Sequence, residues 1–265
     1  MVVVYLIAMR TAEGRRLDDL AKGTLSEQSR AFDETSELLD TISVSSLALL
    51  GATIMAIALL RGRPRLALGA GVIVLGANLT TQAMKAQLDR PGPFGPEAGS
   101  YPSGHVTVAM SLAMALILVT PPDLRVAATL LGAGYAIAVG VAVIAVDWHR
   151  PSDVVGAYLV TVAWTAAVAA VLASPAGAGE LGRRGRTPSR AVRAAGAVAV
   201  LLGIAFAAIV AGATLSRRDL VQIADDRTAF AAAAAVCALA CAGLAAVVAA
   251  LVQRAASPRP GAPAR

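Results

Sequence analysis

Long apolar runs constrain this chain more than any other feature of its sequence. A helix needs about 20 apolar residues to cross roughly 30 Å of hydrocarbon. Hydrophobic residues make up 57% of the chain and charged residues only 15%, which excludes an ordinary soluble domain. The sequence therefore predicts an all-α, polytopic transmembrane helical bundle. Seven runs are candidate spans: 42–60, 66–84, 106–119, 126–146, 154–172, 194–215 and 229–252.

The chain divides into five parts around these runs. We expect residues 1–41 to form a partial first helix and an extracytoplasmic segment, and residues 42–173 to form a transmembrane core. Residues 174–193 are rich in Gly, Pro and Arg and predict a basic cytoplasmic linker. Residues 194–252 predict two additional transmembrane helices, and residues 253–265 a disordered tail.

Cysteine use is sparse. Cys237 and Cys241 lie four residues apart, on one face of the last predicted helix. Two cysteines in an alanine-rich helix are more often packing residues than a disulfide or a metal site. We expect both to be packing residues.

The basic residues are distributed unequally between alternate loops. The loops on one side of the predicted bundle hold 12 of the 23 basic residues and only two of the 17 acidic ones. Because cytoplasmic loops carry the excess of Lys and Arg, this side is predicted to be cytoplasmic. Topology thus explains the formal net charge of +6, and we expect no nucleic-acid partner.

Two short polar stretches, 101–105 and 147–153, contain the only two histidines of the chain. Each stretch opens an apolar run, and the runs 106–119 and 126–146 lie between the two. This pair of segments would carry both imidazoles to the same membrane surface, which the charge distribution makes extracytoplasmic. We expect the chemistry of the protein at this surface.

Several residues at this surface are suited to binding a phosphate group. Ser103 and Gly104 begin a predicted helix, whose exposed backbone N–H groups attract anions. Lys85 and Arg90 stand at the end of the preceding helix and would neutralise the anion. Basic residues at an extracytoplasmic helix end oppose the charge bias, which favours a functional role over interfacial anchoring.

The two histidines supply candidate catalytic groups. His149 and Asp153 are four residues apart, so they share one helical face if the helix has begun there. A carboxylate bound to one ring nitrogen fixes the tautomer and leaves the other nitrogen as a nucleophile. His105 would then protonate a departing oxygen. The alternative is that Ser103 and Asp153 only cap helices at a wet interface.

At these residues the chain resembles the membrane-bound branch of the type-2 phosphatidic acid phosphatase superfamily. That family shows a Lys followed by Arg-Pro, then Pro-Ser-Gly-His, then Ser-Arg-x5-His-x3-Asp, and works without a metal through a phosphohistidine. The resemblance covers residues 42–172. It implies no cofactor and the following roles: His149 as nucleophile, Asp153 as its orienting partner, His105 as general acid, and Lys85, Arg90, Ser103 and Gly104 as phosphate ligands.

The sequence departs from the family pattern in two places. The second Arg-Pro expected in the first motif is replaced by Gly92-Pro93, so only Arg90-Pro91 remains. The Ser-Arg pair of the third motif is replaced by Ala142 and Val143. Arg150, next to His149, is the candidate replacement for the missing phosphate-binding arginine. These departures make altered substrate choice or weak activity credible.

The N-terminal part offers no motif. Residues 1–9 are apolar but too short to span a membrane, and they indicate a short helix or the end of a helix that starts upstream. Residues 11–40 mix both charges with loosely spaced apolar side chains, which is typical of a surface helix. We expect this segment to lie on the membrane or to pack over the histidines.

The leading hypothesis is a multi-pass phosphatase of the cell membrane that acts on a lipid phosphate or pyrophosphate, of the polyprenyl pyrophosphate or phosphatidate type, taken from the outer leaflet. The Ala-, Gly- and Arg-rich composition fits a GC-rich bacterial genome. One alternative is a phosphotransferase on the same scaffold. Another is a non-catalytic lipid-phosphate-binding protein, which Gly92 and Val143 favour and the intact histidine pair opposes. A transporter fits less well, because the sequence shows no pair of broken helices.

Overall fold

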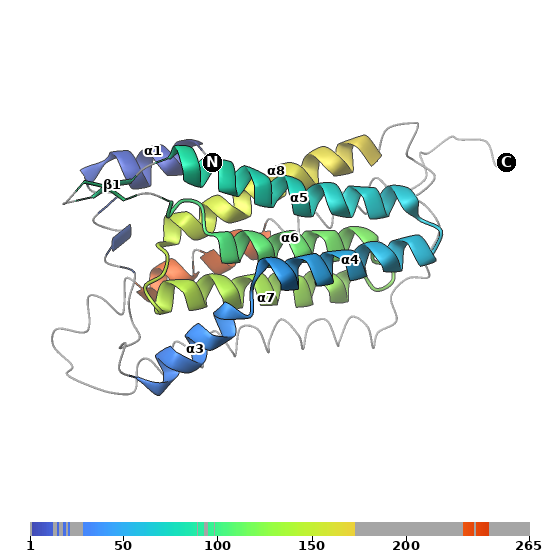
Figure 1. The fold of residues 1–265 in the computed structure, drawn as a ribbon, viewed down its shortest axis with the longest axis horizontal. Coiled ribbons are helices and arrows are strands. Elements are labelled where there is room, and N and C mark those ends of the chain that lie inside the picture. The colour runs from blue at the N-terminus through green and yellow to red at the C-terminus, as the bar shows by residue number, and fades with distance from the viewer. Residues whose placement is uncertain are drawn as a thin grey trace.

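The protein is an α-helical membrane bundle, which confirms the predicted fold class. Its structure is a computed structural model that describes residues 2–12, 15, 18–19, 21, 29–88, 90–92, 95–97, 99–172, 230–235 and 237–243. The elements in chain order are α1 (Val2–Arg10), α3 (Arg30–Asp40), α4 (Val44–Leu60), α5 (Pro64–Gln87), β1 (Arg90–Gly92), β2 (Gly95–Glu97), α6 (Gly104–Val119), α7 (Arg125–Ala145) and α8 (Pro151–Leu172) (Figure 1).

The C-terminal predictions fall mostly outside the described residues. The linker at 174–193, the helix at 194–215 and the tail at 253–265 all lie outside them. Within the last predicted span, residues 230–235 and 237–243 are helical. The prediction of two additional transmembrane helices therefore stays a prediction.

Helix boundaries follow local sequence signals. Ser43 and Ser46 form a reciprocal capping box at the start of α4. Gly62, with φ 65°, ends α4 in the left-handed conformation that glycine adopts without steric cost. Pro64 then occupies the first turn of α5, where its missing N–H costs no hydrogen bond. A three-residue turn thus reverses the chain.

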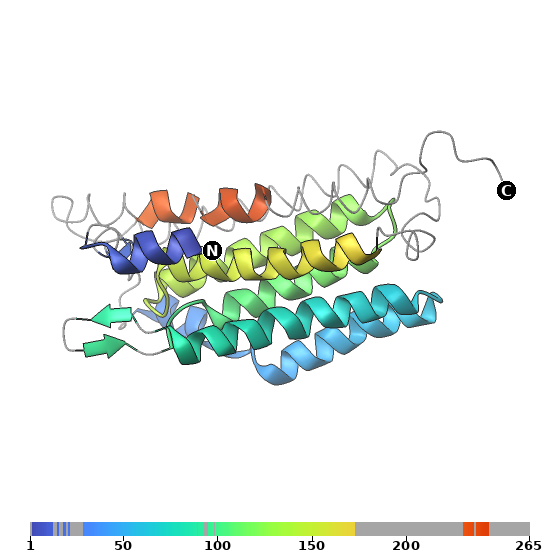
Figure 2. The same cartoon turned by 90° about the horizontal axis from the view of Figure 1, so that it is seen from above.

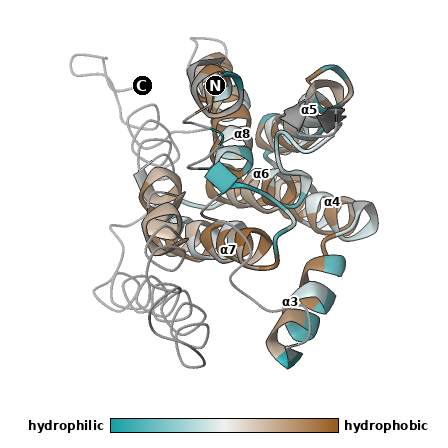
Figure 3. Cartoon of the chain, turned by 90° about the vertical axis from the view of Figure 1, so that its left-hand side faces the viewer, coloured by the Kyte–Doolittle hydropathy of each residue, from teal (hydrophilic) through white to brown (hydrophobic). Residues whose placement is uncertain are grey.

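Helix α6 forms the centre of the bundle, in contact with α4, α5, α7 and α8 (Figure 3). Three helices, α5, α7 and α8, are long and apolar enough to cross a membrane, and α3 and α4 together would form a fourth span bent by 53°. The 16 residues of α6 reach only about 24 Å. Twelve of them are buried, so its shortness is accommodated within protein.

Small residues let the central helices approach closely. A methyl group on Gly132 would lie 2.9 Å from the Cβ of Ala113 in α6, and one on Gly140 would lie 2.4 Å from the hydroxyl of Tyr158 in α8. That hydroxyl donates to the carbonyl of Ala136 at 2.9 Å. Glycines thus create space for α6 and α8 against α7.

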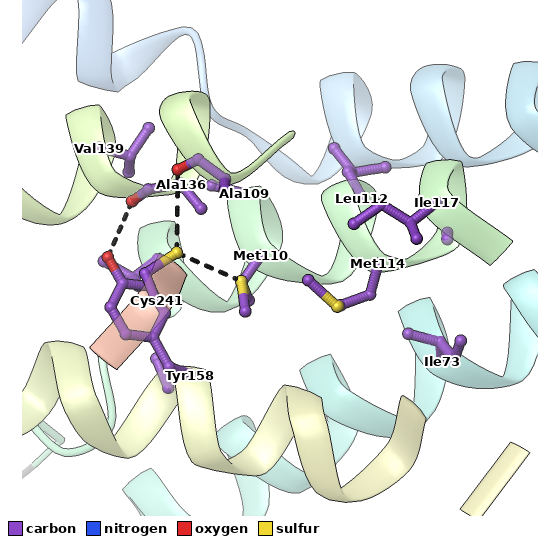
Figure 4. Close-up of a cluster of buried hydrophobic side chains, with 14 of the residues drawn as sticks. Ile73, Ala109, Met110, Leu112, Met114, Ile117, Ala136, Val139, Tyr158 and Cys241 are labelled. Atoms are coloured by element: carbon purple, nitrogen blue, oxygen red, sulfur yellow. Dashed lines mark hydrogen bonds between the residues drawn. The ribbon is translucent and has the colours of Figure 1, made fainter. Parts of the chain in front are cut away.

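The helical residues 230–235 and 237–243 pack against this core, where Figure 4 shows Cys241. Cys237 and Cys241 are both free thiols and almost completely buried. The Sγ atom of Cys241 lies 3.8 Å from the Sδ atom of Met110 in α6. The prediction that these cysteines serve packing is therefore confirmed.

Different elements lie at the two ends of the bundle. The end of α5, the start of α6, the end of α7 and the start of α8 meet at one end, together with α1, α3 and the β1–β2 ribbon (Figures 1 and 2). We call this the histidine end. The opposite end holds the α4–α5 and α6–α7 turns, where Arg61 donates to the carbonyl of Val119 and Arg125 to that of Thr120.

The histidine end differs from the sequence prediction in one segment. Pro and Gly residues usually indicate a loop, but the stretch that begins at Arg90 contains an antiparallel ribbon in which Arg90 is paired with Glu97 and Gly92 with Gly95. A two-residue connection between glycines is short enough to pair the flanking residues. Within the segment 11–40, residues Arg30–Asp40 form the helix α3, which is capped by Ser29 and buries Leu39.

Candidate functional site

Two loops bring the histidines together at the histidine end. His105 lies in the first turn of α6, and His149 lies between α7 and α8. Their ring centroids are 6.5 Å apart, with an angle of 62° between the ring planes. Both rings are partly buried. This distance places both imidazoles within reach of one phosphate-sized group.

The end of α7 positions His149. Asp147 adopts a left-handed conformation with φ 61°, which Asp tolerates better than most residues. The N–H groups of Trp148 and His149 both donate to the carbonyl of Val143 at 3.0 Å, and the N–H of Asp147 donates to that of Ile144. This Schellman-type end fixes the backbone of His149 against the last turn of α7.

A buried carboxylate orients the His149 ring. Nδ1 of His149 lies 3.3 Å from Oδ2 of Asp153, whose side chain is completely buried. The same oxygen accepts the backbone N–H of Arg150 at 3.1 Å. When Nδ1 donates to this carboxylate, the Nε2 atom of His149 carries the lone pair that a nucleophile needs.

The start of α6 is tied to the start of α8. The Ser103 N–H donates to the carbonyl of Asp153 at 3.0 Å, and the Ser103 side chain caps α6 by accepting from Val106. The ammonium group of Lys85 lies beside this cap, 3.6 Å from where a Cβ on Gly104 would stand. The Lys85 cation therefore stands close to the positive end of α6, in a position to bind an anion together with it.

The other candidate phosphate ligands are placed differently. Arg90 lies in β1, and its side chain is outside what the structure describes. The guanidinium of Arg150 forms an ion pair with Asp19, and its side chain is 13% exposed. Arg150 therefore contributes its backbone N–H to Asp153 while its guanidinium binds the N-terminal segment.

The N-terminal segment supplies residues that the sequence reasoning missed. Asp18 accepts the Ser152 N–H at 2.9 Å and the Ser152 hydroxyl at 2.5 Å. It thus caps α8 from 134 residues away, where Ser/Asp caps are usually local. The ring of Tyr5 lies 5.7 Å from that of Tyr101. No spacing rule links such distant residues, so a single sequence carries no signal for them.

The position of the missing arginine is apolar. The Val143 side chain is completely buried in the core, and its carbonyl is occupied by Trp148 and His149. Trp148 in turn places its ring 5.3 Å from that of His105. The family arginine is thus replaced by a core side chain, and the backbone at this position supports the loop that carries His149.

The described part of the chain contains no group of three or more His, Cys, Asp or Glu side chains that could hold a metal ion. The groups that the structure brings together at the histidine end are the two histidines, Asp153 and the Lys85 ammonium near Gly104.

Comparison with known proteins adds a family assignment. Residues 41–175, half of the chain, match the family model of the PAP2 superfamily. Neither the curated proteins nor the solved structures include a match to this chain. The matched region spans α4 to α8 and contains both histidines.

Proposed function

Since this chain belongs to the PAP2 superfamily, which indicates phosphatase-type activity on phosphate esters, we propose that it hydrolyses a lipid phosphate or pyrophosphate at the extracytoplasmic membrane face through a phosphohistidine. The observation that carries this proposal is the ordered pair of His149 and Asp153, with His105 at a ring distance of 6.5 Å. A nucleophile, its orienting group and an acid are the minimum set for such a reaction.

The first chemical step uses His149 as the nucleophile. Its Nε2 atom attacks phosphorus, and the bond between phosphorus and the ester or bridging oxygen breaks. His105 gives its proton to that leaving oxygen. Asp153 stabilises the positive charge that develops on the His149 ring, as a buried carboxylate does for a catalytic imidazole.

The second step returns the enzyme to its initial state. Neutral His105 accepts a proton from water, the resulting oxygen attacks phosphorus, and the bond between phosphorus and Nε2 breaks. Lys85, Arg90 and the Ser103–Gly104 helix start would bind the phosphate oxygens in both steps. The Lys85 ammonium beside Gly104 supports this role most directly.

A lipid substrate is supported by the position of the site in the fold. His149 lies where the membrane-length helices α7 and α8 meet, His105 lies at the start of α6, and α5 ends at Gln87, two residues after Lys85. A site at the end of membrane spans lies at the depth of lipid headgroups. A phosphate on a membrane lipid would reach it without leaving the bilayer.

The extracytoplasmic face is supported by charge. Arg61 and Arg125 lie at the end opposite the histidines, whereas α3 brings Asp33, Glu37 and Asp40 to the histidine end. Cytoplasmic loops favour basic residues. In intact cells, an impermeant thiol reagent should label Glu37→Cys and leave Asp123→Cys unlabelled. The reverse pattern would invert the orientation.

The test of function is phosphate release by purified protein in lipid nanodiscs, with a polyprenyl pyrophosphate or phosphatidate as substrate and a chelator present. Chelator-resistant release that disappears in His149→Ala supports the proposal. Release that requires an added acceptor alcohol would instead identify a phosphotransferase.

One alternative has specific support. Val143 in the core and Arg150 paired with Asp19 leave the site with fewer phosphate ligands than the family pattern, which favours a non-catalytic lipid-phosphate-binding protein. Saturable binding of the lipid without phosphate release by the unmodified chain would select this alternative.

A further inference from the structure

An apolar groove runs between α3 and α7 beside the histidine end. Its volume is about 280 Å³. The two helices contact each other along it, and Figure 3 shows α3 lying outside the bundle on the side of α7. Its walls include Leu38, Leu39 and Ile42 from the α3 side, and Tyr135, Ala138 and Ala142 from α7. We call this the α3–α7 groove.

The groove presents a surface suited to hydrocarbon. No charged side chain occurs among the described residues that line it. The hydroxyl of Thr41, one of its few polar groups, donates to the carbonyl of Leu38 at 2.6 Å and therefore needs no further partner as a donor. The acids Asp33 and Glu37 of α3 are exposed and are not among the lining residues. An apolar ligand would lose no hydrogen bond by entering this groove.

Both walls of the groove lead to the histidines. On the α3 wall, Leu39 is followed by Asp40, the last residue of α3, at the histidine end. On the α7 wall, Ala142 is followed by Val143, whose carbonyl accepts the His149 N–H at 3.0 Å. A chain in the groove would therefore end where a phosphate could meet both imidazoles.

We propose that the α3–α7 groove holds the hydrocarbon chain of the substrate while the phosphate lies between His105 and His149. This inference rests on the proposed function and extends it, because it selects phosphates carried on a long apolar chain. In a bilayer the chain leaves surroundings that are equally apolar, so the groove orients the substrate more than it adds affinity. Orientation alone can raise the rate of a bound reactant strongly.

The test uses a series of n-alkyl phosphates from butyl to dodecyl, kept monomeric in water, with protein in nanodiscs. Burial of each added methylene should raise kcat/KM by up to about fourfold, until the groove is filled. Phenyl phosphate, which has no alkyl chain, reports the chemistry without the groove. A chain-length profile that is flat in the unmodified protein would overturn the proposal.

Two substitutions on α7 separate the groove from the rest of the helix. Ala138→Phe should fill the groove and flatten the chain-length profile. Ala127 is the matched control. It lies eleven residues before Ala138, which is about three helical turns, so it is on the same face of α7 but outside the groove. Ala127→Phe should leave the profile intact. Equal profiles in the two variants would contradict the groove assignment.

A second measurement does not depend on turnover. In His149→Ala protein, a dodecyl phosphate with a diazirine at the chain end should label α3 and α7 residues of the groove, and Ala138→Phe should reduce that labelling. Labelling elsewhere that Ala138→Phe does not change would overturn the groove. If the groove is labelled but no phosphate ester is hydrolysed by the unmodified protein, the proposed function fails while the groove assignment stands.

Discussion

The Nδ1 atom of His149 lies 3.3 Å from Oδ2 of Asp153, and that one oxygen also accepts the Arg150 N–H. The Asp153 side chain is fully buried and that of His149 only 10% exposed. Water therefore has little access to the contact, and low local polarity strengthens it. The shared oxygen couples the orientation of the imidazole to the backbone at the start of α8.

Asp153→Asn should lower kcat by on the order of 10²-fold or more, because the amide keeps the shape but cannot offset the charge on the His149 ring. The variant should fold, since an amide oxygen can still accept the Arg150 N–H. Steady-state kinetics and a thermal melt measure both effects. A kcat close to that of the unmodified protein would remove Asp153 from the mechanism.

The Asp18–Ser152 contact should stabilise the start of α8. Asp18→Ala leaves two donors of Ser152 without their partner and should cost about 1–3 kcal/mol in unfolding free energy. Ser152→Ala removes one of the two hydrogen bonds. The double variant should therefore lose less unfolding free energy than the two single variants lose in sum. Thermal unfolding of the three variants measures the cycle, and strictly additive losses would show that the contact has no energetic weight.

Lys85 and Arg150 should differ in their effect on catalysis. Lys85→Ala removes a cation next to Gly104 and should lower kcat/KM by roughly 10- to 100-fold, since a bond to a charged group contributes about 1.5–3 kcal/mol. Arg150→Ala removes a guanidinium held by Asp19 and should have a much smaller effect. The comparison needs kcat/KM of both variants on one substrate. A larger loss for Arg150→Ala would identify its guanidinium as the replacement for the family arginine.

Gly156→Ala should destabilise the packing of α8 against Tyr101, near the start of α6. The new methyl group would stand 2.6 Å from the ring of Tyr101, which is fully buried two residues before Ser103. Overpacking of this kind costs typically about 1–3 kcal/mol. The melting temperature and the activity should both fall. Gly51→Ala in α4 is the control, because its methyl group would meet only Val74 at an ordinary 3.7 Å; equal melting temperatures for the two variants would contradict the predicted clash.

The helices could be predicted from the sequence because hydrophobic length and local caps determine them. The run predicted at 42–60 is α4, and the prolines at Pro64 and Pro151 stand in the first turns of α5 and α8. The contact of His149 with Asp153 forms although His149 precedes α8, which begins at Pro151, so it does not arise from a shared helical face as the spacing predicted. These features depend on residues within a few positions of one another.

Contacts between distant segments could not be predicted in this way. Asp18 and Asp19 belong to a stretch with mixed charges, and nothing in their spacing indicates Ser152 and Arg150 as partners. The direction of the Arg150 side chain depends on that contact, so its proposed role as a phosphate ligand could not be judged from its position beside His149. The β1–β2 ribbon was missed because Pro and Gly usually indicate a loop.

The most direct test of the central claim is detection of the covalent intermediate. Protein that is turning over phenyl phosphate is quenched in base, which preserves phosphohistidine, and digested for mass spectrometry. The phosphohistidine mechanism predicts a phosphoryl group on His149 that is absent from His149→Ala. Phosphate release without any phosphohistidine, or release that persists in His149→Ala, would contradict it.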